Sequence, residues 1–390
     1  MKNVIHIAVT ALAVALSPAA PAQAGAPAIS GKPIKVGAIS TLTTAAAFPQ
    51  SVMAAKAYFD QVNAQGGIRG RKLVLVADDD KGDPKLAGAI ARRLVENEGV
   101  VAMVSSASAM ECSVNAAYYV SKGIAAIQGT GVDPACFNSP NISPVNTGPY
   151  IGLAAALQFA SEVRGKQKVC AVLMNIPGMG PEYEKTIASW KRHFRKQLHL
   201  LDREYPLGSP TAPYVKKVLD AKCDAAVFLA LEPDVVNWID AVKATGREDV
   251  DWLFLTPAYT ADVARKAGTV GNSMFAMSEF LPWSSRALDL TDWRETMNKG
   301  KVPLTSFSQG GYLAAQVFVS ALRRIPGEIT RESVLGALRE LDRYESPLIG
   351  TPYSFGDKPR HNANHAIIPM VLRDGQWRVA HPDWIVVPTE

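Results

Sequence analysis

Short apolar runs that alternate with helical segments constrain the fold of this chain more than any other feature. Continuous apolarity over a few residues indicates strands that are covered on both faces, as in a parallel sheet with helices on either side. The sequence therefore predicts an α/β fold in which successive βαβ units are right-handed. Strands are predicted at residues 34–39, 73–76, 100–104, 124–127, 169–174, 225–231, 252–255 and 274–277.

The first βαβ unit shows how the strands end. A predicted strand at 34–39 leads through a loop of small residues into a helix that ends at Gly66, where a left-handed cap is expected. The second strand, 73–76, runs into three aspartates at 78–80 and then into Asp83, which begins the next helix together with the following proline. Because open α/β sheets bind small molecules at the carboxyl ends of their strands, we expect a polar binding crevice there.

The chain is long enough for two lobes. At 390 residues, of which 48% are hydrophobic, it exceeds the usual size of a single core. The alternation of strands and helices is predicted once before about residue 150 and again after it, and a stretch rich in proline and glycine at 140–149 marks the break. Near the C-terminus, apolar segments at 367–372 and 376–379 flank an Asp-Gly turn and predict a hairpin.

The N-terminus has the pattern of a secretory signal. Lys2 supplies a positive charge, residues 5–16 form an apolar run, and residues 22–24 read Ala-Gln-Ala, which suits cleavage. An uncleaved membrane anchor is the competing interpretation, but the apolar run is shorter than the roughly 20 residues that cross a bilayer. We therefore expect a signal peptide at 1–24 and a mature protein in the periplasm.

The segment at 63–84, NAQGGIRGRKLVLVADDDKGDP, resembles the opening of periplasmic leucine/isoleucine/valine-binding proteins, the type I solute-binding proteins of ABC importers. The resemblance extends over nearly the whole mature chain and is weakest in the second lobe. It implies two doubly wound parallel-sheet lobes joined by a three-stranded hinge, with crossings near residues 144–149, 277–282 and 347–353. The implied N-terminal lobe comprises residues 33–148 plus 279–348, and the C-terminal lobe comprises residues 149–278 plus 349–390.

Two loops of the first lobe suit a ligand's anion. The segments 105–109 and 129–133 each follow a predicted strand, and backbone N–H groups at helix starts beside Ser and Thr hydroxyls can hold a carboxylate. Helix capping is the alternative role of the same side chains. The resemblance implies that these loops hold the ligand's carboxylate; because Ala109 falls where the family has a ligand-binding serine, Ser108 is chosen as a one-residue shift. The expected ligand-binding residues of this lobe are Ser108, Ala109, Thr130, Gly131 and Val132.

The second lobe departs from the resembled family at three positions. An aromatic residue is replaced by Pro177, a second aromatic position falls near Glu232, and the acidic partner of an amino acid's ammonium falls at Ala258. Because a buried ammonium needs a carboxylate, either Glu232 receives it or the ligand has none. We favour a ligand other than a plain branched-chain amino acid, such as an aromatic or aliphatic acid. Further candidates for the pocket wall, equally consistent with ordinary packing, are Phe48, Met179 and Tyr259.

Four cysteines in an exported protein permit disulfides. Cys112 and Cys136 each follow a predicted strand by a few residues, on neighbouring loops, so we expect them to be paired. Cys170 and Cys223 each lie at the start of a predicted strand. They are either paired with each other or buried as free thiols.

Motifs for other functions are weak. His361 and His365 have the spacing of a metal-binding pair but no glutamate between them, and no nucleophile elbow is present. The basic run at 191–196 is expected to be a solvated helix face, not a nucleic-acid site. We therefore expect no catalysis, no cofactor, no metal and no nucleic acid; a hydrolase or lyase that uses Glu232 with the His361 region is a weaker alternative.

Together these features predict an exported solute-binding protein of an ABC importer. It would capture a small carboxylate-bearing ligand, an amino acid or an aromatic or aliphatic acid, between its two lobes. Its expected partners are the ligand and the membrane permease subunits, and the protein is expected to be a monomer. The alternative is a ligand-sensing binding protein on the same scaffold that acts on a signalling partner.

Overall fold

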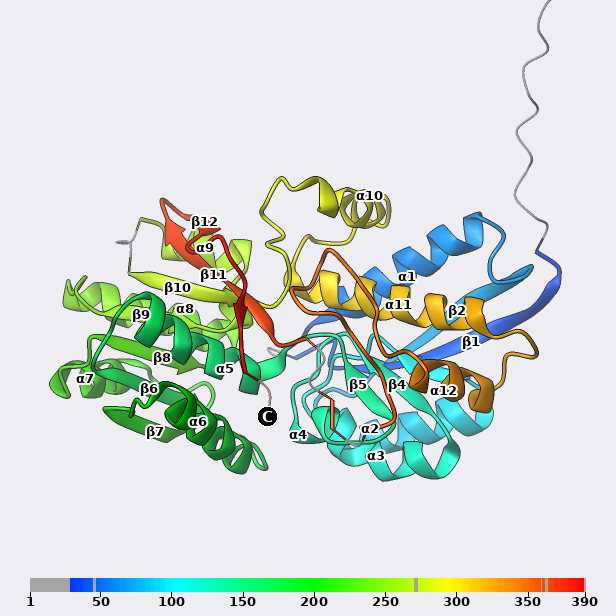
Figure 1. Cartoon of the computed structure of the whole chain (residues 1–390), viewed down its shortest axis with the longest axis horizontal. Helices are drawn as coiled ribbons and strands as arrows, with labels where there is room; N and C mark the ends of the chain where they lie inside the picture. The colour runs from blue at the N-terminus through cyan, green and yellow to red at the C-terminus, as the bar shows by residue number, and fades with distance from the viewer. Residues whose placement is uncertain (1–28, 45–46, 270–272, 359, 362–363, 389–390) are drawn as a thin grey trace, which may run out of the picture.

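The computed structural model describes residues 29–44, 47–269, 273–358, 360–361 and 364–388. Its strands form two sheets, each packed with helices, and the two resulting lobes lie side by side (Figure 1). The α/β class and the two parallel-sheet lobes that the sequence predicted are confirmed. The predicted signal peptide at 1–24 lies outside the described residues.

The N-terminal lobe contains a five-stranded parallel sheet in the order β2-β1-β3-β4-β5. Its strands are β1 (Gly31–Ser40), β2 (Arg71–Asp79), β3 (Ala102–Val104), β4 (Ala125–Gln128) and β5 (Ile142–Pro144). The helices around it are α1 (Pro49–Ala64), α2 (Pro84–Arg92), α3 (Glu111–Lys122), α4 (Pro134–Phe137), α10 (Thr291–Lys299), α11 (Ser306–Arg324) and α12 (Arg331–Arg339). A single π-helical turn (Arg93–Asn97) follows α2.

Local sequence explains the ends and contacts of these helices. Asp83 caps α2 by accepting hydrogen bonds from two backbone N–H groups, as its position before a proline predicted. Thr305 and Ser308 form a capping box at the start of α11. Helix α11 then crosses α1 so closely that a Cβ at Gly311 would lie 1.9 Å from Ser51 O, a contact that only glycine permits.

The C-terminal lobe contains a sheet in the order β12-β11-β10-β9-β8-β6-β7, with β13 paired to β11. Its strands are β6 (Val169–Met174), β7 (Leu200–Tyr205), β8 (Ala225–Leu229), β9 (Asp251–Phe254), β10 (Met274–Ser278), β11 (Ala366–Arg373), β12 (Gln376–Val379) and β13 (Ile385–Val386). The strands from β7 to β10 are parallel, and β11 and β12 are antiparallel to their neighbours. The helices are α5 (Gly148–Gln158), α6 (Gly180–Phe194), α7 (Ala212–Asp220), α8 (Glu232–Thr245) and α9 (Ala261–Ala267).

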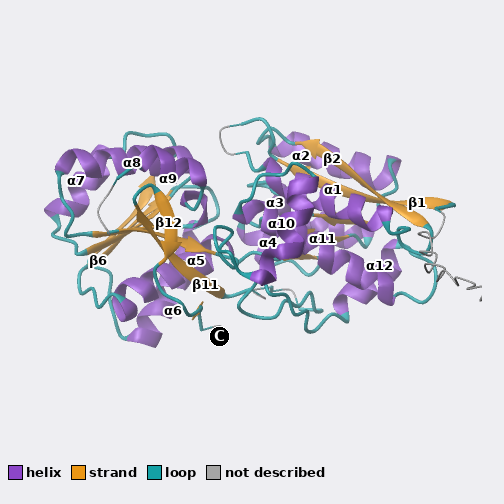
Figure 2. Ribbon diagram, turned by 90° about the horizontal axis from the view of Figure 1, so that it is seen from above, coloured by secondary structure: helices purple, strands orange, loops and turns teal. Residues whose placement is uncertain are grey.

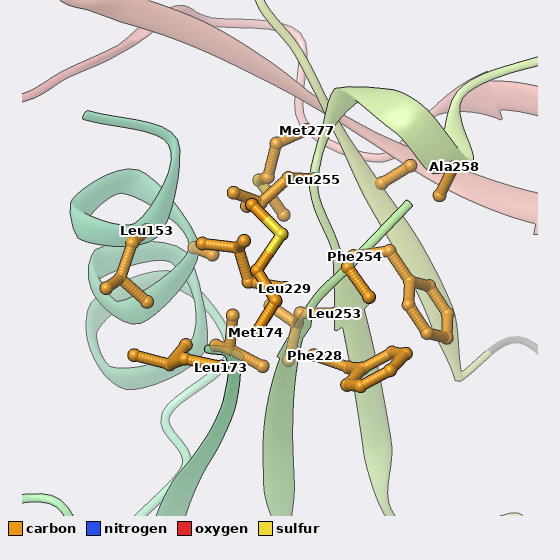
Figure 3. Close-up of a cluster of buried hydrophobic side chains, with 14 of the residues drawn as sticks. Leu153, Leu173, Met174, Phe228, Leu229, Leu253, Phe254, Leu255, Ala258 and Met277 are labelled. Carbon is orange, nitrogen blue, oxygen red and sulfur yellow. The ribbon is translucent and has the colours of Figure 1, made fainter. Parts of the chain in front are cut away.

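The core of this lobe is apolar on both faces of its sheet. Figure 3 shows buried side chains of β6, β8 and β9 in one cluster with Leu153 on α5 and Met277 on β10. Phe228 stacks on Trp238 of α8 with ring centroids 4.0 Å apart. The predicted hairpin of β11 and β12 is present, and both residues of its turn, Asp374 and Gly375, have positive φ, as a tight hairpin turn requires.

Three segments connect the two sheets. The chain leaves the first sheet after β5 and enters α5, returns after β10 toward α10, and enters β11 from the segment that follows α12 (Figures 1 and 2). The lobe boundaries assigned from the sequence, at residues 148, 278 and 348, remain predictions at single-residue precision. No helix in the described part of the chain is long and apolar enough to cross a membrane.

All four cysteines are paired. Cys112 at the start of α3 is joined to Cys136 in α4, the pairing that the sequence led us to expect. Cys170 in β6 is joined to Cys223, just before β8, which decides between the two alternatives left open above. The sequence separations are 24 and 53 residues, so each bond closes a substantial loop of the unfolded chain.

Replacing Cys170 and Cys223 together by alanine should lower the free energy of unfolding by about 4 kcal/mol, because the larger closed loop restricts the unfolded chain more. The corresponding Cys112 and Cys136 replacement should cost about 3 kcal/mol. Urea denaturation followed by circular dichroism measures both. Alkylation of any of the four thiols in the unreduced, folded protein would contradict this assignment.

Candidate ligand-binding site between the lobes

Three loops of the N-terminal lobe meet at the carboxyl edge of its sheet. Ser40 at the end of β1 pairs with Ala107 after β3, and Ala107 pairs with Thr130 after β4. The Thr130 amide donates to Ser106 O at 3.2 Å, which fixes the third loop against the second. The two loops expected to hold an anion therefore lie side by side, as parallel strands require.

Ser108 serves as a helix cap. Its Oγ accepts hydrogen bonds from the amides of Met110 and Glu111 at 3.2 and 3.1 Å, and its hydroxyl donates to Asp80. Asp80 is fully buried and also accepts from Thr41 Oγ1 at 2.7 Å. The hydroxyl proton of Ser108 is thus committed within the protein, while Ala109 beside it is exposed.

A second buried carboxylate lies behind this loop. Glu111, the first residue of α3, accepts a 2.6 Å hydrogen bond from Tyr119 Oη. Burial raises the pKa of Glu111 to about 7, and the negative charge of Asp80 adds to that effect. With two acidic groups around Ser108, this part of the edge disfavours an incoming anion.

The neighbouring loop at 130–132 has hydrogen-bond donors that are not used within the described residues. Asn146 holds the Gly131 backbone from both sides, accepting from its amide at 2.7 Å and donating to its carbonyl at 3.2 Å. Tyr150 Oη donates to Val132 O at 3.4 Å. Within the described residues no hydrogen bond engages the Thr130 hydroxyl or the Val132 amide, so both can serve a ligand.

The residues predicted in the C-terminal lobe also gather at one edge. Met179, Glu232 and Ala258 follow β6, β8 and β9, which are adjacent in the sheet, so their loops lie together. Glu232 is half-buried at the start of α8. Burial raises the pKa of its carboxyl, and a hydrogen bond with Thr260 acts in the opposite direction. Its contacts are therefore with its own lobe.

Three of the suggested wall residues make ordinary packing contacts. Tyr259 is buried between Trp283 and Trp377, with ring centroids 5.0 and 5.9 Å away, and its hydroxyl bonds Ser284 Oγ at 2.8 Å. Buried Met179 accepts from the Tyr183 hydroxyl through sulfur. Half-buried Phe48 lies 4.4 Å from the Phe307 ring.

Ala258 is fully buried and lies near apolar side chains such as Leu255 and Phe254 (Figure 3). An acidic side chain is therefore absent at the position where the resembled family has one, and its surroundings are apolar. The Ala258 side chain itself is sealed from solvent in this arrangement.

Sequence interpretation missed a residue where the three crossings meet. Glu279, directly after β10, accepts three hydrogen bonds through Oε1 from the segment after β5. The donors are Asn146 Nδ2 at 3.3 Å, Thr147 Oγ1 at 2.9 Å and Gly148 N at 2.8 Å. Asn364, on the third crossing, donates to Glu279 O at 3.0 Å. An acidic residue directly after an apolar strand was the available signal.

A cavity of about 770 Å³ lies between Phe137 and Asn138 of the first lobe, helices α5 and α6, and residues 354–358, 360 and 361; Tyr150, which bonds Val132 O, is part of its wall. None of the residues predicted to bind the ligand lines it. His361 is buried in its wall, and burial lowers the pKa of its imidazole. The one group of metal-ligating side chains in the described part of the chain is Cys112, Asp133 and Cys136, whose two cysteines form a disulfide.

Two α/β lobes with facing strand edges and three crossings define a two-lobed binding protein. A family model described as periplasmic binding protein matches residues 33–376, and the chain belongs to that family. A stretch of 75 residues is 36% identical to an amino acid binding protein of Pseudomonas aeruginosa. That match covers 19% of this chain and 20% of the relative.

Solved structures share the fold at low sequence identity. A possible leucine/isoleucine/valine-binding protein from Rhodopirellula baltica has a TM-score of 0.78 at 19% identity, covering 92% of this chain and 98% of that one. A fatty acid ABC transporter substrate-binding protein from Thermomonospora curvata has a TM-score of 0.76 at 20% identity, covering 92% and 94%. A solute-binding protein from R. palustris in complex with 4-hydroxybenzoate has a TM-score of 0.75 at 16% identity, covering 92% and 98%.

Glu111→Gln should change how stability depends on pH. The folded-state pKa of about 7 exceeds the ordinary glutamate value of 4.5, so the stability contributed by the neutral acid is complete below about pH 4.5 and is lost as the pH rises through 7. The variant should therefore be more stable than the wild type at pH 8, by at most about 3 kcal/mol. Denaturation at pH 5 and pH 8 measures this, and parallel curves for both proteins would contradict it.

Proposed function

We propose that the protein captures a small carboxylate-bearing ligand between its lobes and delivers it to the permease subunits of an ABC importer. The observation that carries the proposal is the loop at 130–132, where the Thr130 hydroxyl and the Val132 amide are unengaged at the edge that faces the other lobe. Hydrogen bonds to a charged acceptor contribute about 1.5 to 3 kcal/mol each. Two such donors suit a carboxylate.

The relatives support this ligand chemistry. The proteins with the same fold are described as binding leucine, isoleucine or valine, fatty acid, or 4-hydroxybenzoate, and the relative from Pseudomonas aeruginosa is described as binding an amino acid. These ligands share a carboxylate and differ in the rest of the molecule. The geometry of this chain is consistent with a first lobe that binds the carboxylate in the same way for each ligand. The second lobe's side of the pocket would then vary with the rest of the ligand.

The anion is assigned to Thr130 and Val132 in preference to Ser108. The Ser108 hydroxyl donates to Asp80 and caps α3, so it has no proton left for a ligand. The Ala109 amide and Gly131 remain part of the surrounding loops, but the Gly131 amide is already bound to Asn146.

We also propose that the protein is exported to the periplasm, takes part in transport and is a monomer. The signal pattern at 1–24 supports delivery to the periplasm, and the family consists of proteins that bind solutes there. Ligand capture would favour the closed arrangement only by as much as that arrangement binds the ligand better than the open one. No catalytic step is proposed for the cleft.

Thr130→Val should weaken binding of a carboxylate ligand about tenfold, because it removes one donor to the anion and keeps the shape of the side chain. A thermal-shift screen over amino acids, aromatic acids and short aliphatic acids would identify a ligand, and calorimetry would then measure its affinity. Thr245→Val, on the far end of α8, serves as the matched control.

Ser108→Ala tests which of the two loops holds the ligand's carboxylate. It should lower the free energy of unfolding by about 1 kcal/mol through loss of the cap. An affinity loss as large as that of Thr130→Val, at equal stability, would place the anion on Ser108 instead. Absence of binding to every acid in the screen would count against the proposed function as a whole.

A further inference from the structure

The carboxylate of Glu279 lies at the junction of all three crossings. It is 6% exposed, and its hydrogen-bond donors are the neutral groups of Asn146, Thr147 and Gly148. Burial raises the pKa of its carboxyl, and these donors lower it only in part. No Lys or Arg forms an ion pair with it among the described residues.

A structural buried acid in the same protein is paired differently. Asp251 in β9 has a side chain only 4% exposed, yet Arg164 Nε and Lys166 Nζ lie 2.7 and 3.2 Å from its two oxygens. Burying a carboxylate is costly unless a cation compensates it. Among the described residues Glu279 has no such cation, and neither do the buried acids Asp80 and Glu111, which are held by neutral donors.

The second carboxylate oxygen of Glu279, Oε2, accepts none of the hydrogen bonds from residues 146–148. The three hydrogen bonds from residues 146–148 all go to Oε1. The Thr256 hydroxyl, which donates to Met277 O, is a further hydrogen-bond neighbour of the carboxylate, and Oε2 is not sealed from solvent. By contrast, the free oxygen of Glu111 is sealed from solvent. Oε2 therefore keeps some access to solvent, although the residue as a whole is buried.

The position of Glu279 connects both edges of the cleft. Asn146, which donates to its Oε1, also holds Gly131 in the loop assigned to the ligand's carboxylate. On the other side Thr256, whose hydroxyl donates to Met277 O, lies beside the carboxylate and lowers its pKa. Thr256 precedes Ala258 by two residues, so Glu279 lies next to the loop that lacks an acid.

We propose that Glu279 Oε2 receives a cationic group of the ligand, an ammonium, from the base of the cleft. This inference rests on the proposed function, because it assumes that the carboxylate is held at Thr130 and Val132. The ligand class is then a zwitterion, an amino acid, and the expectation of a ligand without an ammonium is revised. Glu232, whose contacts are with Thr260 of its own lobe, is not the receptor.

The separation of the two subsites suits such a ligand. The path from the Gly131 amide through Asn146 to Glu279 contains two hydrogen bonds of 2.7 and 3.3 Å, so Glu279 Oε1 lies within roughly 8 Å of the amide between Thr130 and Val132. In an α-amino acid one carbon separates the ammonium from the carboxylate. With a hydrogen bond of about 2.8 Å at either end, the zwitterion spans a gap of this size.

Glu279→Gln tests the proposal because it removes the charge and preserves the shape and the acceptor Oε1. The probes are matched pairs that differ only in the ammonium: leucine with 4-methylpentanoate, and phenylalanine with 3-phenylpropanoate. The wild type should bind the amino member of at least one pair better. The variant should lose at least tenfold in affinity for that member and keep its affinity for the other within about threefold. Asp220→Asn, an exposed acid on α7, is the control.

Three results would overturn the inference. Equal weakening of both members of a pair would show that Glu279 only supports the hinge, and the same selective loss in Glu232→Gln would move the receptor there. Preference of the wild type for the des-amino acids would show that the ligand has no ammonium, and the proposed function would stand. Binding of neither member of any acid pair in the wild type would instead count against the proposed function.

Discussion

Parallel pairing places the carboxyl ends of neighbouring strands at one edge of a sheet, and this constraint shapes everything that follows in the protein. In the first lobe it aligns the loops after β1, β3 and β4, as the bridges between Ser40, Ala107 and Thr130 show. In the second it aligns the loops after β6, β8 and β9. Three crossings connect the two sheets, and Glu279 joins the loop that follows β5 to the segment that follows β10, so polar segments that are distant in sequence are brought together.

The crossings themselves are held by polar contacts. Glu279 accepts hydrogen bonds from the segment after β5, and the Asn364 side-chain amide donates to the carbonyls of both Glu279 and Val145. These bonds join three segments that are more than eighty residues apart, and they place an acid where the lobes must move relative to each other. A hinge of three strands leaves one soft rotation. The same contacts therefore position the cleft and limit how it opens.

Local patterns predicted the elements that have a strong local signature. The apolar runs of β6 and β8 and the Asp-Gly hairpin were found, whereas β7 was missed because three consecutive polar residues interrupt Leu200–Tyr205 at a sheet edge. Pairing of Cys170 with Cys223 was left open, since only the strand order brings β6 beside β8. Ser108 was ambiguous because a cap and an anion site use the same atoms. Glu279 was missed because its role comes from segments far apart in the chain.

The place of a cation receptor determines which step of capture it assists. An acid on the loop at Ala258 would approach the ligand only when the second lobe swings in, so its charge would favour closure. Glu279 is held at the crossings and bonded to residues 146–148, next to the first lobe's loop, and such a receptor is present before closure. It would then strengthen docking in both arrangements about equally, which shifts no equilibrium. Closure must in that case be driven by contacts of the second lobe's edge with the remainder of the ligand.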